Sequence, residues 1–502
     1  MVTPERDGRA LFKIVKSVVG DGSGARVGVL SFPKRRPIET PNFLGLTARG
    51  AVPHITPDNV IKRTELGGVY MALEDFIETT RKKKVPAIYE MKSEDVEPLH
   101  AYTATPSHVF TVLAARRHPA IASPLGNTKE SVSVFTSTGF QNLSNEDYRQ
   151  AVNRLKPDVV IPLADLPYGL PNPDPAAPKS KTAISSKRQL RMIGRTEDWI
   201  SQVFEAGTKS TGEGGPTVAS PAAVFAPILP VPYPTQWEYL SVLEHDHSSN
   251  LSGLAVYDVD LLPDLPNHVS LMPLPRLSLS HTSTPQEILR QVQLGIDVFT
   301  VSFLNSMSDA GIALSFSFPP PPPADASEGI KELGINMWDP THEIAVQPLV
   351  SGCTCYACTK HHRAFLHHLL GAKEMLGWTL LQIHNYHIVH NFFAGIRASL
   401  SSSLEKFEED YRNFERIYDS ELPTGTGTRP RARGYNFKSR GGDDRINKPA
   451  WEKYETGSDP ALAGEKAGLA VTGVAAQGSE TPLVPEGDAM ELDKKGFAKI
   501  AK

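Results

Sequence analysis

The chain has 502 residues, with 52 lysines and arginines against 56 aspartates and glutamates, and a formal net charge of −4. Bulk charge therefore does not indicate nucleic-acid binding, and any such surface has to be local. The length allows more than one domain, although single barrels of about 250 residues are common. All 3 cysteines lie in one short segment, which leaves none for disulfides elsewhere and indicates a reducing compartment.

The N-terminal segment, MVTPERDGRALFKIVKSVVGDG, has no apolar run long enough for a signal peptide. No apolar stretch of the chain approaches the ~20 residues that a membrane span needs. We therefore expect a soluble, cytoplasmic protein without a membrane span. A peripheral position on the mitochondrial outer membrane stays open.

Apolar, β-rich runs alternate with amphipathic stretches through the middle of the chain. The runs are 132–140, 158–166, 222–231, 251–259, 268–279 and 297–303. Between some of them, residues 187–204 and 286–295 space their apolar side chains as one face of a helix. Buried strands that alternate with helices predict an α/β protein with a parallel sheet. This many strands favours a closed barrel, with active groups at the C-terminal ends of the strands.

Other segments divide the chain into domains. We predict a barrel over residues 10–330, a zinc-binding helical region over 331–420 and a tail over 421–502. Residues 169–186 are rich in proline, serine and lysine, so we expect a mobile insertion there. The tail is rich in glycine, threonine and arginine and then in alanine, glycine and glutamate, a composition typical of disorder.

The cysteines form the strongest motif. Cys353, Cys355 and Cys358 are followed by His384, which gives the spacing Cys-x-Cys-x2-Cys-x25-His. Three thiolates and one imidazole complete a tetrahedral shell around one zinc ion and leave no position for a substrate or a reactive water. The spacing therefore predicts a structural site. Other histidines compete for the fourth position: His361, His362, His367, His368, His387 and His390.

Two helices are predicted after the cysteines, over residues 361–376 and 378–400. Most of their apolar side chains are expected to face the core. The apolar side chains that remain exposed are a candidate partner surface.

Residues 353–385, CTCYACTKHHRAFLHHLLGAKEMLGWTLLQIHN, resemble the zinc region of the tRNA-guanine transglycosylases, in which the fourth ligand corresponds to His384. Residues 25–58 resemble the family's N-terminal β-hairpin and first barrel strand. SVFTSTGFQ (133–141) resembles the family's DSGGFQ segment, and residues 252–258 resemble GGLAVGE. The resemblance covers about residues 10–405 and implies an irregular (β/α)8 barrel with a zinc subdomain near its C-terminus.

The positions of the family's carboxylates are changed in this chain. The family exchanges a guanine base in tRNA through a covalent enzyme–ribose intermediate, and its nucleophilic aspartate corresponds to Thr300. Its second carboxylate, in DSGGFQ, corresponds to Thr136. Threonine does not titrate near neutral pH, and neither position has an evident base beside it in the sequence. The family's base-reading aspartate aligns with Leu163 or, with a two-residue gap, with Asp165.

Further departures lie in two other motifs. The arginines of the family's RNA-contacting PTRxARxG segment correspond to Ser306 and Asp309. Ser252 and Tyr257 occupy glycine positions of GGLAVGE, and the tyrosine should crowd a pocket that lets a purine approach the backbone. We therefore predict that the chain has no catalytic residue. Its barrel would keep the family's fold around an inactive site.

This pattern resembles the non-catalytic members of the family, which pair with the catalytic subunit of the eukaryotic queuine tRNA-ribosyltransferase. That enzyme inserts queuine at the wobble position of certain tRNAs. The resemblance implies pairing through the zinc subdomain. One alternative is an active transglycosylase whose nucleophile has moved, and the other is a zinc-stabilised RNA-binding scaffold. The candidate relocated nucleophiles are Asp165, Asp258, Asp260 and Asp309.

RNA contact is plausible at two basic segments. In residues 429–448, basic side chains interleave with Tyr435 and Phe437, which suits phosphate contact and base stacking. The basic residues singled out there are Arg429, Arg431, Arg433, Lys438 and Arg440. The second candidate is the basic face of the helix predicted over 187–204: Lys187, Arg188, Arg191 and Arg195. An ordinary solvated tail and an ordinary solvated helix face are the alternatives.

Overall fold

A computed structural model describes residues 11–17, 24–78, 85–93, 95–121, 123, 126–136, 138–166, 184–208, 222–322 and 329–427. All of these residues belong to one unit of the chain, Met1–Ile446. Of the predicted insertion, only residues 184–186 are described, and of the predicted tail only 421–427. Asn336 donates a hydrogen bond of 3.0 Å to Thr426, so these first tail residues lie against the zinc region.

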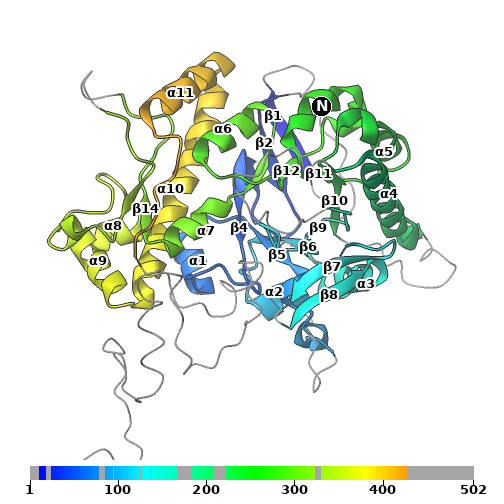
Figure 1. The fold of residues 1–502 in the computed structure, drawn as a ribbon, viewed down its shortest axis with the longest axis horizontal. Helices are drawn as coiled ribbons and strands as arrows, with labels where there is room; N and C mark the ends of the chain where they lie inside the picture. Colours follow the sequence, from blue (N-terminus) through cyan, green and yellow to red (C-terminus); the bar gives the residue numbers. More distant parts are fainter. Residues whose placement is uncertain are drawn as a thin grey trace, which may run out of the picture. The chain divides into compact units, whose positions relative to one another are not determined.

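Eight parallel strands close into a barrel, which confirms the predicted (β/α)8 fold (Figure 1). They follow one another around the barrel in chain order, and the last pairs with the first. The strands are β4 (Asn42–Leu46), β5 (Gly68–Ala72), β6 (Phe110–Ala114), β9 (Val159–Val160), β10 (Ala223–Ile228), β11 (Gly253–Val256), β12 (Arg276–Ser278) and β13 (Val298–Thr300).

One predicted run does not supply a barrel strand. Residues 132–140 fall in an antiparallel hairpin of β7 (Ser131–Thr136) and β8 (Gly139–Ser144), which pair with each other and not with the barrel. Gly139 has φ +110° at the turn, a conformation that favours glycine and that reverses the chain inside the apolar run. Strands β5 and β6 were not among the predicted runs, although each is a fully buried run of 5 residues.

Helices surround the barrel and form the region after it. They are α1 (Pro57–Arg63), α2 (Pro98–Thr103), α3 (Asn145–Leu155), α4 (Ser186–Thr208), α5 (Tyr233–His245), α6 (Pro285–Gln293), α7 (Ser302–Asp309), α8 (Tyr356–Lys360), α9 (Arg363–Gly371), α10 (Met375–Ser402) and α11 (Leu404–Ile417). The helices predicted over 187–204 and 286–295 are α4 and α6, and the two predicted after the cysteines are α9 and α10. No helix in the described part of the chain is long and apolar enough to cross a bilayer.

Helix α6 shows how the local sequence sets these elements. The hydroxyl of Thr284 accepts a hydrogen bond from the backbone N–H of Glu287, and the Glu287 carboxylate accepts one from the N–H of Ser283. This reciprocal cap fixes the start of the helix. Ile288 and Val292 are fully buried against the barrel core.

A three-stranded antiparallel sheet covers the N-terminal end of the barrel. Its strands are β1 (Leu11–Ser17), β2 (Arg26–Ser31) and β3 (Ile38–Thr40). Phe12, Leu30 and Phe32 of this segment join the apolar cluster that fills the barrel, which also contains Phe110 and Phe225. The sheet therefore closes one end of the barrel and leaves the C-terminal ends of the strands as the open mouth.

A buried ion pair fastens that sheet to the barrel. Arg26 lies 2.6 Å from Asp297, and both side chains are 0 % exposed. Arg26 also donates to the carbonyl oxygens of Met272 and Leu274, and Asp297 accepts from the backbone N–H of Arg276. Both charges are thus fully hydrogen-bonded, which offsets the cost of their burial.

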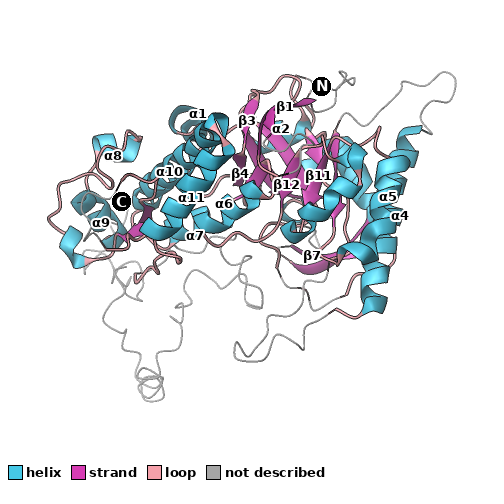
Figure 2. Ribbon diagram, turned by 90° about the horizontal axis from the view of Figure 1, so that it is seen from above, coloured by secondary structure: helices cyan, strands magenta, loops and turns pink. Residues whose placement is uncertain are grey.

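Helix α10 joins the barrel to the zinc region. It packs against β4 on one side and against α8 and α9 on the other, as Figure 2 shows. The remaining strands, β14 (Ile312–Leu314) and β15 (Gly334–Asn336), form a hairpin, and β14 lies against α10. The zinc region is therefore built around the same helix that packs against the barrel.

We predict that Asp297→Ala lowers the free energy of unfolding by about 3–5 kcal/mol, because it leaves the Arg26 charge buried and unpaired. Urea unfolding followed by circular dichroism measures this change. The control is Glu65→Gln, which removes an exposed pair with Arg36 and should cost less than about 1 kcal/mol. Equal, small losses in both variants would show that the buried pair does not anchor the sheet.

Candidate metal centre and barrel mouth

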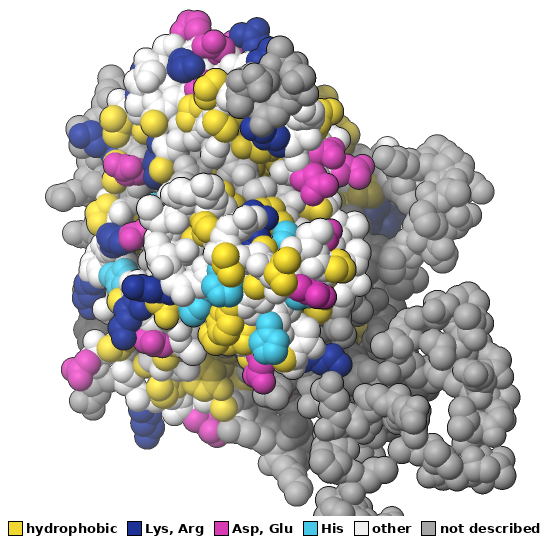
Figure 3. Space-filling model, turned by 90° about the vertical axis from the view of Figure 1, so that its left-hand side faces the viewer, with side chains coloured by type: hydrophobic (Ala, Val, Ile, Leu, Met, Phe, Trp, Pro, Cys, Tyr) yellow, Lys and Arg dark blue, Asp and Glu magenta, His cyan; other side chains and the backbone are white. Residues whose placement is uncertain are grey.

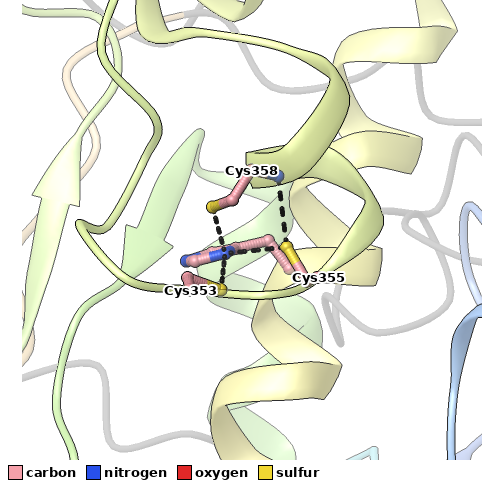
Figure 4. Close-up of side chains that lie close together, drawn as sticks. Cys353, Cys355 and Cys358 are labelled. Atoms are coloured by element: carbon pink, nitrogen blue, oxygen red, sulfur yellow. Dashed lines mark hydrogen bonds between the residues drawn. The ribbon is translucent and has the colours of Figure 1, made fainter.

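The predicted metal ligands converge on one point. Figure 4 shows the three cysteine side chains turned toward a common centre. The Nδ1 atom of His384 lies 3.7 Å from the sulfur of Cys353, 3.5 Å from that of Cys355 and 3.4 Å from that of Cys358. In a tetrahedral zinc site, with Zn–S of about 2.3 Å and Zn–N of about 2.0 Å, nitrogen and sulfur are about 3.6 Å apart. The donor set and its dimensions therefore fit zinc.

The motif spacing follows from the short helix α8. Cys355 caps its N-terminus, and its sulfur accepts a hydrogen bond of 3.3 Å from the backbone N–H of Cys358. The i,i+3 relation places both sulfurs on the same side of the helix. Gly352 adopts φ +75° just before Cys353, a left-handed turn that favours glycine and brings the first cysteine back to the cluster.

A hydrogen bond to strand β14 orients the ring of His384. His384 is fully buried on α10, and its Nε2–H donates a hydrogen bond of 2.9 Å to the carbonyl oxygen of Leu314 in β14. This bond assigns the proton to Nε2 and leaves Nδ1 free to bind a metal. The next residue, Asn385, accepts from the N–H of Leu314 and donates to Ser308, which fixes β14 against α10. The sequence analysis did not identify these supporting contacts, because the main acceptor is a backbone carbonyl.

Three of the other histidines have different partners. His362 caps α9, His367 bonds to the carbonyl oxygen of Met337, and His361 stacks on Phe365. Among the described residues, the only group of at least three side chains placed to bind one metal ion is Cys353, Cys355, Cys358 and His384. The structure therefore selects His384 from the candidates that spacing left open.

The cluster strongly perturbs the acidity of its members. Burial alone would lower the pKa of His384, but hydrogen bonds with Cys353 and Cys358 outweigh it and raise this pKa to about 9. Hydrogen bonds with Cys355 and Cys358 lower the pKa of Cys353, whereas hydrogen bonding to Cys353 raises the pKa of Cys355. Cys353, Cys355 and His384 thus compete for shared protons, and a divalent cation would replace these protons.

We predict that Cys355→Ser removes stoichiometric zinc from the purified chain, because it deletes one of four ligands and the cap of α8. Metal content is measured by inductively coupled plasma mass spectrometry. Thr354→Ser, in the same loop, is the control and should keep its zinc. The barrel should retain its circular dichroism spectrum in both variants; zinc retained by Cys355→Ser would contradict the assigned ligand set.

The barrel mouth holds a cavity of about 490 Å³. Most of its wall is built from residues that follow the C-terminal ends of β6, β9, β10, β11 and β12, with Tyr70 of β5 and Val132 of β7 added. The polar side chains in the wall are Tyr70, Arg116, Arg117, His118, Tyr257 and His281. No aspartate or glutamate among the described residues lines the cavity.

Thr136 and Thr300, the positions that the resemblance assigns to the family's carboxylates, are both buried and hydrogen-bonded to backbone. Thr300 donates a bond of 2.9 Å to the carbonyl oxygen of Ser278, which joins the ends of β13 and β12. Thr136 donates a bond of 2.9 Å to the carbonyl oxygen of Gly139 and closes the turn between β7 and β8. Neither side chain lines the cavity. Their hydroxyl groups serve the fold and are not presented to a ligand.

The structure separates the two candidates for the base-reading position. Leu163 lines the cavity, whereas Asp165 is fully buried outside the wall. Asp165 lies 2.6 Å from Arg188 and 2.9 Å from Arg195, and it accepts a bond of 2.7 Å from Asn127. Burial opposes its ionisation, but the hydrogen bonds from Arg188, Asn127 and Arg195 lower its pKa. An acid held in this way is a structural anion.

This arrangement corrects the predicted basic face of α4. Arg188 and Arg195 turn inward to Asp165, and only Lys187 and Arg191 of the four are exposed. Helical periodicity alone did not indicate the inward direction, because the partner lies on a loop more than 20 residues earlier. The basic residues Arg429, Arg431, Arg433, Lys438 and Arg440 lie outside the described residues.

The remaining candidate aspartates also have ion-pair or hydrogen-bond partners. Asp309 lies 2.6 Å from His54, Asp258 accepts from the backbone N–H of Asp260, and Asp260 pairs with Arg290. None of the three aspartates lines the cavity.

The three other substituted positions, Tyr257, Ser252 and Ser306, lie in different parts of the structure. Tyr257 lines the cavity, where a crowding side chain was predicted. Ser252 precedes β11 at the opposite end of the barrel, and Ser306 bonds to the carbonyl oxygen of Phe303 within α7.

The Arg116–His118 part of the wall was not identified from the sequence, although the run ARRHP directly after an apolar segment could have indicated it.

A closed parallel (β/α)8 barrel, followed by a Cys3His cluster that joins a cysteine loop to a helix packed on the barrel, defines a class of barrel proteins with a candidate structural metal site. The queuine tRNA-ribosyltransferase family model matches residues 21–420, and the chain belongs to that family.

Three relatives of the chain share one name. The chain is 34 % identical over 462 residues to a queuine tRNA-ribosyltransferase accessory subunit 2 of Schizosaccharomyces pombe, covering 91 % of this chain and 96 % of the relative. It is 29 % identical over 398 residues to the protein of that name from Drosophila grimshawi, covering 78 % of this chain and 89 % of the relative. The protein of that name from Aedes aegypti is 29 % identical over 288 residues, which cover 55 % and 64 % of the two chains.

Proposed function

We propose that this chain is the non-catalytic subunit of a heterodimeric queuine tRNA-ribosyltransferase, in which the other subunit exchanges guanine for queuine at the tRNA wobble position. The observation that carries the proposal is the barrel mouth, whose described wall contains no carboxylate. Base exchange through a covalent intermediate needs a nucleophile for the anomeric carbon and a group that transfers protons. Thr300 and Thr136, at the corresponding positions, are bonded to backbone.

The names of the relatives support this assignment, since all three cited above are accessory subunits. Relocation of the nucleophile is less well supported, because Asp165, Asp258, Asp260 and Asp309 have structural partners. A zinc-stabilised RNA scaffold without a role in base exchange would not account for relatives named as subunits of this enzyme. We also propose a cytoplasmic location and tRNA as the second partner.

One structural zinc ion has a defined place in this proposal. Cys353, Cys355, Cys358 and His384 would hold it, and no ligand position would remain for substrate. When bound, zinc supplies a cross-link between the cysteine loop and α10. The chain's own residues supply the other contacts: Leu314 orients His384, and α10 packs against β4. The cross-link would keep the surface around α8 and α9 in a fixed shape.

That surface carries exposed apolar side chains suited to a protein partner. Figure 3 views the side of the molecule on which α8 and α9 lie, where hydrophobic side chains and histidines gather. Ile344 is 88 % exposed and Val346 79 %, and Met375 and Leu376 at the start of α10 are each 46 % exposed. We call these four residues the pairing surface. Exposed apolar side chains in one region are typical of interaction sites.

The first prediction from this proposal concerns activity. Incorporation of labelled guanine or queuine into tRNA is measured for this chain alone, the catalytic paralogue alone and their mixture. We expect exchange only in the mixture, and the same rate when this chain carries Thr300→Ala or Thr136→Ala. Each threonine substitution should cost only about 0.5–1.5 kcal/mol of stability, through one lost hydrogen bond. Exchange by this chain alone would overturn the proposal.

The second prediction concerns assembly. The double substitution Met375→Glu and Leu376→Glu should abolish the complex with the catalytic paralogue in sedimentation velocity experiments, because two charges would be buried at the interface. Acidic residues in the first turn of a helix are stabilising, so α10 should remain folded. Val269→Glu, at a site 74 % exposed on the barrel, is the matched control and should pair normally. Normal pairing by the double variant would place the interface elsewhere.

A further inference from the structure

The barrel mouth has lost its carboxylates without being filled. Its cavity of about 490 Å³ is comparable in volume with small-molecule binding sites. The inner wall is apolar and includes Ala114, Ile161, Leu163 and Leu279, whereas Arg116, His118 and His281 form its polar part. A cavity with an apolar inner wall and a few polar groups can hold a ligand that has an organic body and a polar head.

The charges around the cavity favour an anion. Arg116 lines it, and its guanidinium donates a bond of 3.0 Å to the neutral side chain of Asn127. Arg117 is paired with Glu74 and Asp75, which lie outside the wall.

Behind the wall, two arginines face one carboxylate, as Arg188 and Arg195 both pair with Asp165. Among the described residues, the two arginines that line the cavity meet no carboxylate inside it, because Glu74, Asp75 and Asp165 lie outside the wall. A cleft lined by one sign of charge attracts ligands of the opposite sign.

Two histidines add hydrogen-bonding capacity. The Nε2 atom of His118 is enclosed and has no hydrogen-bond partner, which is unusual for a buried polar atom. Burial, reinforced by the charge of His281, lowers the pKa of His118 to about 4, so this ring is neutral at pH 7. His281 is exposed where it lines the cavity. A ligand oxygen near His118 would satisfy the enclosed nitrogen.

We propose that this cavity binds a phosphate group, with Arg116, His118 and His281 as donors and the apolar wall in contact with the organic body of the ligand. Guanidinium and imidazole donors are well matched to phosphate oxygens. A guanine base would instead need an acceptor for its N–H groups, and the described wall offers no carboxylate. The inference goes beyond the proposed function, because it concerns binding by this chain alone.

The test is isothermal titration of the full-length chain with inorganic phosphate, adenosine monophosphate and guanine. We expect phosphate and the nucleotide to bind and guanine not to bind. Arg116→Gln and His281→Gln should each weaken phosphate binding about tenfold, as expected for loss of one hydrogen bond to a charged group. Arg191→Gln and His245→Gln, which alter exposed residues elsewhere, are the matched controls and should bind as the unmodified chain does.

Competition with tRNA separates the two sources of phosphate. Displacement of bound tRNA by the nucleotide would assign the cavity to an RNA phosphate, whereas nucleotide binding beside tRNA would assign it to a free phosphorylated ligand. Unchanged zinc content and thermal unfolding establish that the variants are folded, and the exposed position of His281 makes its variant the safer one. Absence of phosphate binding, equal binding by the variants and the unmodified chain, or preferential binding of guanine would each overturn the inference. These outcomes do not depend on the base-exchange result.

Discussion

One buried imidazole connects the two halves of this structure. The ring of His384 donates from Nε2 to Leu314 in β14 and presents Nδ1 to three sulfurs. Its helix, α10, also packs against β4, the first barrel strand. The cysteine loop, the β14–β15 hairpin and the barrel wall are therefore positioned by a single helix, and any surface built around α8 and α9 depends on this contact. Retention of the complete ligand set is understandable on structural grounds alone.

Buried ion pairs hold the barrel at both of its ends. At its closed end, Arg26 and Asp297 form a fully buried pair that fastens the N-terminal sheet. At the open end, Glu74 with Arg117 and Asp165 with Arg188 hold the loops around the mouth. None of these networks uses the positions at which the family carries its catalytic carboxylates. Thr136 and Thr300, the positions that the resemblance assigns to these carboxylates, bond to backbone.

The sequence was most informative where a chemical requirement fixes the spacing. Three cysteines within six positions predict a metal cluster, because few other arrangements use them together. The fourth ligand was less certain from spacing, since seven histidines were available and the orienting acceptor is a backbone carbonyl. The class of fold followed from the alternation of strands and helices. Strands β5 and β6 were missed although they are longer than the predicted strands β9, β12 and β13.

The remaining predictions were wrong or incomplete where tertiary contacts decide the direction of a side chain. Arg188 and Arg195 looked like a solvent-exposed basic face, and only the buried position of Asp165 shows why they turn inward. The same contact decides that Leu163, not Asp165, lines the cavity. Residues 132–140 read as one strand because a glycine that reverses the chain is not distinguished by an apolar pattern. In each case the deciding partner is distant in sequence or belongs to the backbone.

The central claim is that the barrel of this chain performs no covalent chemistry. The most direct measurement is to trap the enzyme–ribose intermediate on tRNA in the mixture of this chain and the catalytic paralogue, and to separate the proteins under denaturing conditions. The account predicts that labelled RNA is attached only to the paralogue. Labelled RNA attached to this chain would contradict it and would require a nucleophile that the described barrel mouth does not present.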